Sequence, residues 1–259
     1  MRPVLIEVFG IPVFSYGFMM AVAFLAGYFL VLRRFRELGL SLEKLADFAV
    51  ILAVSGIIGA RLLYVLIGWE YYSAHPAQIF NLPAGGLSFH GGAVLAVITG
   101  VYYVRRQRLP LGKIADAIAP AFALGVALVR IGCLLNGCCY GLPSTVPWAF
   151  DSSYLHDVPR HPTQLYESLA MFLVFLYLLK REKHTFFPGY LLVLFTVLYS
   201  ASRFIIEFFR DVPEFWPPLT MAQVASLFFI VLGTAVIVVG QKRFEAQKNS
   251  IQGEQDVSR

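Results

Sequence analysis

The stretch DFAVILAVSGIIGARLLYVLI, residues 47–67, is a continuous apolar run of the length that a helix needs to cross a lipid bilayer. A bilayer core of about 30 Å requires roughly 20 helical residues. Comparable runs occur at about residues 15–32, 90–104, 114–135, 164–179, 188–206 and 221–240. Because the runs are continuous rather than alternating, they predict helices that satisfy their own backbone in lipid, not the strands of a barrel.

The composition of the whole chain agrees with this reading. Hydrophobic residues make up 58% of the sequence and charged residues 14%, with a mean hydropathy of +0.68, which is outside the range of soluble domains. We therefore predict an all-α integral membrane protein with about seven transmembrane helices. The third and fifth runs are the shortest or least clearly bounded, so six or eight spans remain alternatives.

The distribution of lysine and arginine predicts the orientation. Every lysine follows the first, third, fifth or seventh run, as do most arginines, which marks that side as cytoplasmic. The N-terminus is then outside and the C-terminus inside, and the net charge of +5 needs no nucleic-acid partner. We treat residues 1–241 as a single polytopic domain without a removable signal peptide, and residues 242–259 as a polar, frayed cytoplasmic tail.

The lysine-free side and the spans still carry arginines, namely Arg2, Arg61, Arg130, Arg160, Arg203 and Arg210. A charge at membrane depth is costly, and the planar guanidinium binds phosphate through two hydrogen bonds. These arginines therefore predict an anion held at the outer leaflet, with a phospholipid phosphate as the obvious candidate. The alternative is that Arg61, Arg130 and Arg203 pair with internal acids such as Asp116 or Glu207 and lock helices together.

His90 opens the third run with glycine pairs on both sides, Gly85-Gly86 before it and Gly91-Gly92 after it. An imidazole that titrates near neutral pH can accept a thiol proton or polarise an ester. Glycines allow a ligand to approach the backbone closely, but they are also simple packing devices between membrane helices.

The three cysteines, Cys133, Cys138 and Cys139, lie close together in the sequence. With His156 or His161 they suggest a metal site, but no Cys-x2-Cys pair is present, so we predict none. A cysteine nucleophile would lack a nearby histidine. A disulfide from Cys133 to Cys138 or Cys139, and free packing thiols, both remain open. Further along, Tyr166 and Glu167 enter the fifth run with polar groups that should face the helix bundle.

Five motifs in one order resemble those of the prolipoprotein diacylglyceryl transferase family. They are Tyr16-Gly17, residues 85–92, Ala115-Asp116 leading to Arg130-Ile131-Gly132, residues 161–167, and residues 202–210. The resemblance, which spans about residues 12–240, implies a bacterial plasma-membrane enzyme whose active site faces the outer leaflet. Such an enzyme transfers the diacylglyceryl group of phosphatidylglycerol to the lipobox cysteine of a preprolipoprotein, forming a thioether and releasing glycerol phosphate. It implies no cofactor.

The resemblance also assigns residues. Catalytic positions are Tyr16, His90, Arg130, Tyr199 and Arg203; positions that bind phosphatidylglycerol are Arg130, Arg203, Arg210, Gly91, Gly92, Asn136 and Gly141; supporting positions are Asp116, Glu207, Glu167 and Arg61. The chain departs from the family's Arg-Ile-Gly-Asn-Phe-Ile-Asn-Gly-Glu pattern, because Cys133 stands at the first Asn and Cys138 at the Glu. Any role assigned to those two positions is therefore in doubt.

Two other classes of protein compete with this reading. An anion-selective transporter would use the same arginines and His90, but such proteins often show paired halves, which this sequence lacks. A membrane metalloenzyme would use the cysteines with His161 and would need bound zinc.

Overall fold

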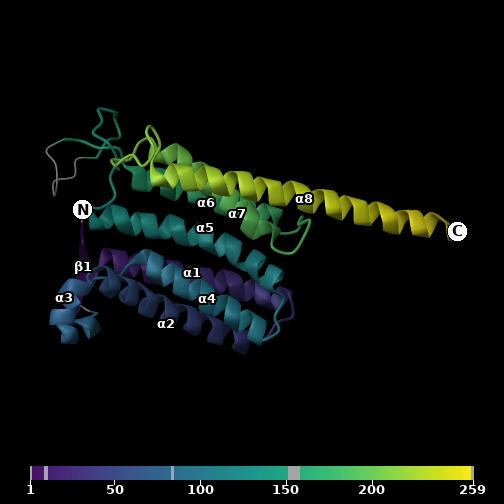
Figure 1. Ribbon diagram of the computed structural model, residues 1–259, viewed down its shortest axis with the longest axis horizontal. Coiled ribbons are helices and arrows are strands. Elements are labelled where there is room, and N and C mark those ends of the chain that lie inside the picture. The colour runs from purple at the N-terminus through teal and green to yellow at the C-terminus, as the bar shows by residue number, and fades with distance from the viewer. Residues whose placement is uncertain (1, 9–10, 83–84, 151–157, 258–259) are drawn as a thin grey trace. The chain divides into compact units, whose positions relative to one another are not determined.

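The computed structural model describes residues 2–8, 11–82, 85–150 and 158–257. Each of the seven predicted runs forms a long helix (Figure 1). These helices are α1 (Ser15–Glu37), α2 (Leu42–Ile67), α4 (Phe89–Arg106), α5 (Leu111–Asn136), α6 (Thr163–Arg181), α7 (Tyr190–Glu207) and α8 (Met221–Val257).

Four shorter elements were not predicted. The strands β1 (Val4–Val8) and β2 (Ile11–Phe14) pair antiparallel near the N-terminus, where the β-branched valines and isoleucines favour extended backbone. The short helix α3 (Trp69–Ala74) and the 3-10 helix η1 (Pro76–Phe80) follow α2.

Five of the described helices, α1, α2, α5, α7 and α8, are long and apolar enough to cross a membrane. The remaining long helices, α4 and α6, correspond to the third and fifth runs, the least clearly bounded ones. Each carries polar side chains among its 18 or 19 residues, such as His90 in α4 and Gln164 and Glu167 in α6. The protein is thus mostly helical, with five membrane-capable helices.

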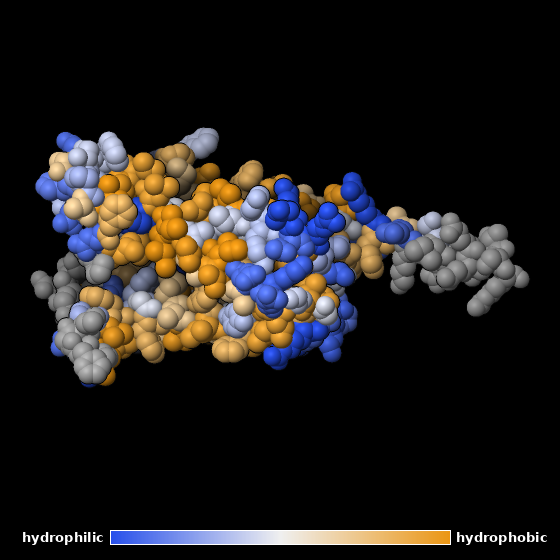
Figure 2. Space-filling model, turned by 90° about the horizontal axis from the view of Figure 1, so that it is seen from below, coloured by the Kyte–Doolittle hydropathy of each residue, from blue (hydrophilic) through white to orange (hydrophobic). Residues whose placement is uncertain are grey.

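On the face that Figure 2 shows, hydrophobic residues form most of the surface between more hydrophilic regions. On α2, Val50, Val54 and Ile57 are at least half exposed, and on α8 Phe228 and Val231 are more than 60% exposed. Apolar surface of this extent is unfavourable in water and fits contact with lipid chains.

The chain divides into two compact units by its internal contacts, which leaves the prediction of a single domain untested. Unit 1 contains Met1–Val31 and Gly112–Arg259, and unit 2 contains Leu32–Leu111. Each unit is described by itself.

In unit 1 the core lies between α5, α6 and α7. The small side chains of Ala119, Ala123 and Ala127 on α5 leave room for Met171 and other large residues of α6, and all of them are buried.

The carboxylate of Asp116 accepts hydrogen bonds from the backbone N–H groups of Gly189 (2.8 Å) and Leu191 (2.7 Å). Asp116 therefore caps the N-terminus of α7.

In unit 2 the helices α2 and α4 meet backbone to backbone. A Cβ atom on Gly59 would lie 2.4 Å from the Gly91 carbonyl oxygen, and one on Gly91 would lie 2.3 Å from the Gly59 carbonyl oxygen. One turn away from Gly59 on α2, Ser55 Oγ accepts a hydrogen bond from the Thr99 hydroxyl of α4 at 2.8 Å. Small residues thus let these two helices approach closely, as is common between membrane helices.

The tail expected to be frayed is helical as far as Val257, because α8 continues into it. The glutamine, lysine, glutamate and alanine residues after Gly240 have good helix propensity, so polarity there does not interrupt the helix.

Candidate functional site

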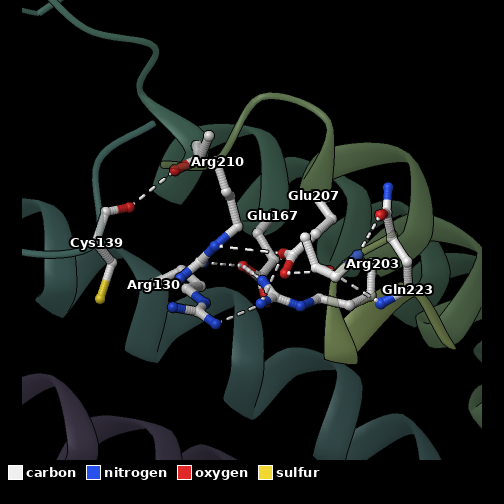
Figure 3. Close-up of polar contacts among 9 residues, drawn as sticks. Arg130, Cys139, Glu167, Arg203, Glu207, Arg210 and Gln223 are labelled. Carbon is white, nitrogen blue, oxygen red and sulfur yellow. Dashed lines mark hydrogen bonds and ion pairs between the residues drawn. The ribbon is translucent and has the colours of Figure 1, made fainter. Parts of the chain in front are cut away.

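Arginines and glutamates converge where helix ends of unit 1 meet (Figure 3). Arg130 lies near the C-terminus of α5, and Glu167 lies in the first turns of α6. Arg203 and Glu207 lie in the last turns of α7, and Arg210 follows that helix. We call these five residues the arginine cluster.

Glu167 is the centre of the arginine cluster. Its Oε1 lies 2.8 Å from Arg130 Nη2, and its Oε2 lies 3.4 Å from Arg203 Nη1 and 3.9 Å from Arg210 Nη1. One carboxylate therefore joins guanidinium groups from three separate segments of the chain.

Glu207 forms the second anchor. Its Oε2 lies 2.9 Å from Arg203 Nη2 and 3.4 Å from Arg210 Nε. The Thr220 hydroxyl donates to Glu207 Oε1 at 3.0 Å, and the Thr220 N–H donates to Gln223 Oε1 at 3.0 Å. The start of α8 thereby holds this carboxylate in place.

The arginine cluster has an excess of positive charge, because three guanidinium groups face two carboxylates, a net of +1. Burial and the charge of Arg203 lower the pKa of Arg210, the direction expected where cations are incompletely neutralised. The arginine side chains are 14–20% exposed and the glutamates only 2–3%. The accessible face of the cluster is therefore cationic.

The predicted pairing of the buried arginines with internal acids is confirmed for two of the three residues considered. Arg130 and Arg203 do pair with internal acids, Glu167 and Glu207, as the helix-locking alternative requires. Asp116, the other acid considered, instead caps α7. The surplus charge leaves the cluster able to bind an anion as well.

Among the described residues, no acid forms an ion pair with Arg61. Its guanidinium, in unit 2, donates to the backbone carbonyl oxygens of Ile79 (2.8 Å), Gly85 (2.8 Å), Gly86 (3.0 Å), Asn81 (3.3 Å) and Gln78. It also lies over the rings of Tyr64 and Tyr72. Arg61 therefore organises the segment that leads into α4, which is a supporting role.

Tyr199 and Tyr16 both lie near the arginine cluster. Tyr199 stands one turn before Arg203 on α7, within electrostatic range of Arg203 and Glu167. Tyr16, at the start of α1, is within range of Arg130. Close approach of α1 is possible because Gly132 lacks a Cβ, which would lie 3.4 Å from the Tyr16 Cα.

His90 belongs to unit 2, at the first turn of α4, where it is exposed and its ring meets the edge of Phe89 at 5.9 Å. The neighbouring glycines, Gly91 and Gly92, pack tightly against α2. A Cβ on Gly92 would lie 2.8 Å from the Gly56 carbonyl oxygen, and Gly91 faces Gly59. The structure thus favours the packing role over a lipid-binding role for Gly91 and Gly92.

Asn136 and Gly141 flank the cysteines after α5. The Asn136 side chain interacts with the Cys138 thiol. A Cβ on Gly141 would lie 2.1 Å from the Phe209 carbonyl oxygen and 2.9 Å from the Cβ of His161, so only glycine fits there. We assign Gly141 to packing beside the arginine cluster.

A second polar group lies near the start of α6; the sequence pointed to Tyr166 there but not to its partners His161 and Trp148. The Tyr166 hydroxyl lies 3.0 Å from His161 Nδ1 and accepts a hydrogen bond from Trp148 Nε1 at 2.8 Å. A pocket of about 450 Å³ adjoins it, lined by Pro147, Trp148, Ala149, Phe150, Pro162, Leu165 and Tyr166. His156, the other histidine considered with the cysteines, lies outside the described residues.

Taken together, five membrane-capable helices and a largely buried cluster with surplus positive charge define a helical membrane protein with a cationic centre. The family model for prolipoprotein diacylglyceryl transferase matches residues 3–239. The chain belongs to this family.

Relatives named phosphatidylglycerol–prolipoprotein diacylglyceryl transferase match over most of their length. The protein of Bacillus cereus is 34% identical, covering 93% of each chain. That of Clostridioides difficile is 33% identical, covering 98% of this chain and all of the relative. That of Geobacter sulfurreducens is 35% identical, covering 88% and 91%.

Proposed function

We propose that the arginine cluster binds the phosphate of phosphatidylglycerol while its diacylglyceryl group is transferred to a prolipoprotein. Family membership and the names of the relatives make the chain a transferase of this kind. The observation that carries the site assignment is the cationic face of the cluster, where Arg130, Arg203 and Arg210 share Glu167 and retain a net charge of +1.

In the reaction we propose, the acceptor is the thiol of the lipobox cysteine in the signal peptide of the preprolipoprotein. Its thiolate sulfur attacks the glycerol carbon that carries the phosphate ester. A C–S bond forms, the C–O bond to phosphate breaks, and glycerol phosphate leaves. The thiol proton passes to a base, for which we propose His90, with Tyr16 and Tyr199 as the next candidates.

The electrostatics favour this step. The phosphate diester carries one negative charge, and the departing monoester gains a second as the C–O bond breaks. A cationic cluster in a low-dielectric site therefore stabilises the transition state more than the bound lipid, which is the condition for catalysis. Bidentate guanidinium groups suit this role because they place two donors on one phosphate.

The topology we propose has seven spans, with α4 and α6 completing the five apolar helices. The N-terminus is outside, the C-terminus is cytoplasmic, and the arginine cluster faces the outer leaflet of the bacterial plasma membrane. The charge pattern supports it, because Arg105 and Arg106 end α4 and Lys180 and Arg181 end α6. The cluster lies at the opposite end of α6, near Glu167.

Conservative replacement of the arginines tests the proposal. Arg130→Lys and Arg203→Lys keep the charge but lose the planar fork, and each should lower turnover by about 10²-fold, comparable to losing one oxyanion donor. Arg105→Lys, at an exposed position in α4, is the matched control.

The assay supplies purified protein in detergent with phosphatidylglycerol and a lipobox peptide, and detects the thioether product by mass spectrometry. A parallel reaction contains a chelator, which tests whether transfer depends on a bound metal ion as the competing metalloenzyme reading requires. Near-wild-type turnover in both lysine variants would refute the assignment of phosphate binding to the arginine cluster.

A further inference from the structure

The three cysteines come together in space despite their unpromising spacing in the sequence. Their Sγ atoms all lie within 4.8 Å of one another, and those of Cys138 and Cys139 are 3.6 Å apart. Cys133 is buried in α5, Cys138 is half-buried, and Cys139 is exposed.

The backbone after α5 is folded in an unusual way to achieve this. Gly137 has a φ of 80° and Cys139 a φ of 67°, so both residues on either side of Cys138 adopt a left-handed backbone conformation. The Cys138 N–H donates to the Cys133 carbonyl oxygen at 3.1 Å, which closes the loop against the end of α5. A non-glycine residue in this region costs roughly 1–2 kcal/mol, and such strain is commonly found at functional sites.

The loop is also held from outside. The Thr163 hydroxyl donates to the Cys139 carbonyl oxygen at 2.8 Å, and the Gln164 side-chain amide donates to the Cys138 carbonyl oxygen. Both donors lie in the first turn of α6, where they are almost fully buried. The positions of the sulfur atoms are thus set by the same helix that carries Glu167.

The spacing of the sulfur atoms suits a single metal ion. Thiolates bound to tetrahedral zinc at about 2.3 Å lie about 3.8 Å apart, so small side-chain rotations would bring all three to bonding distance. Deprotonated sulfur is the form that binds metals.

We propose that Cys133, Cys138 and Cys139 form a three-thiolate binding site for a soft metal ion, Zn²⁺. Each thiol releases its proton on binding, and the fourth coordination position faces outward beside the exposed Cys139, where water completes the tetrahedron. The ion would join the end of α5 to the loop that rests on α6. Its three ligands are not among the residues proposed to contact the lipid phosphate.

The test uses the full-length, reduced protein in detergent, purified without a metal-binding tag. After dialysis against Zn²⁺ and then buffer, elemental analysis should find one zinc per chain. Co²⁺ in place of Zn²⁺ should give a near-ultraviolet sulfur-to-cobalt charge-transfer band, which reports thiolate ligation in the wild-type protein without relying on any variant.

Cys133→Ser, Cys138→Ser and Cys139→Ser should each weaken zinc binding at least 10-fold. His161→Gln, whose ring instead contacts Tyr166, should bind zinc as the wild type does. The proposal is overturned if the reduced wild-type protein binds no stoichiometric zinc, or if the serine variants bind it equally well. Fewer than three free thiols in the unreduced protein, with no zinc binding after reduction, would instead show a disulfide.

Discussion

Replacing Glu167 with glutamine should expose the electrostatic balance of the arginine cluster. The substitution removes one of two carboxylates and raises the net charge from +1 to +2. Arg203 and Arg210 keep Glu207, at 2.9 and 3.4 Å, whereas Arg130 loses its 2.8 Å partner. The predicted effect is therefore that of one orphaned, mostly buried guanidinium.

Removing one partner of a buried pair costs about 3–5 kcal/mol. Because the Arg130 side chain is 20% exposed, the cost should fall at the lower end, about 3 kcal/mol. For a chain of this size that corresponds to a melting temperature roughly 6–12 °C lower. Thermal unfolding in detergent measures the shift, with Glu70→Gln, at an exposed position of α3, as the matched control.

A double variant separates charge from packing. In Arg130→Met/Glu167→Gln the unpaired guanidinium is gone, so at least half of the lost melting temperature should return, while transfer activity should not. If Glu167→Gln melts like the Glu70→Gln control, or if the double variant is no more stable than the single one, the reasoning is wrong.

Three further predictions concern the surroundings of the site. Asp116→Ala should lower stability by about 2 kcal/mol, because two buried N–H groups at the start of α7 lose their acceptor; an unchanged melting temperature would contradict the capping role. Gly91→Ala should destabilise unit 2 by about 1–3 kcal/mol, seen as faster hydrogen exchange in residues 42–106, since its Cβ would meet Gly59; Gly125→Ala, where nothing lies within 4 Å, is the control, and equal exchange in both would argue against tight packing. His90→Gln should keep lipid binding but slow the chemical step by about 10²–10⁴-fold, partly recovered by a peptide with a more acidic nucleophile; loss of lipid binding without such recovery would make His90 a ligand instead of a base.

The helices were predictable because long apolar runs have few alternative structures in lipid. The runs that fell short of the hydropathy of a membrane span, α4 and α6, are those that bring His90 and Glu167 into the protein. Polar side chains reduce the apolar character of these two runs, and local departures from a pattern are often found at functional sites.

Other features depend on contacts that sequence spacing does not encode. Arg130 and Glu167 are 37 positions apart and meet only because α5 and α6 pack together. The partners of Arg61 are backbone carbonyls, which leave no residue signature. The cysteine spacing argued against a metal site because it contains no Cys-x2-Cys pair. Spacing alone does not predict the left-handed backbone at Cys139, which helps to bring the three thiols together.

The shared carboxylate of Glu167 also bears on how the reaction cycle ends. A phosphate that enters the arginine cluster must compete with Glu167 for the same N–H donors of Arg130, Arg203 and Arg210. Once the glycerol phosphate has left its carbon, this tethered anion remains at high effective concentration and reclaims the guanidinium groups. If the arginine cluster binds the phosphate as we propose, Glu167 competes with the product for the arginines, which limits product inhibition and prepares the site for the next lipid.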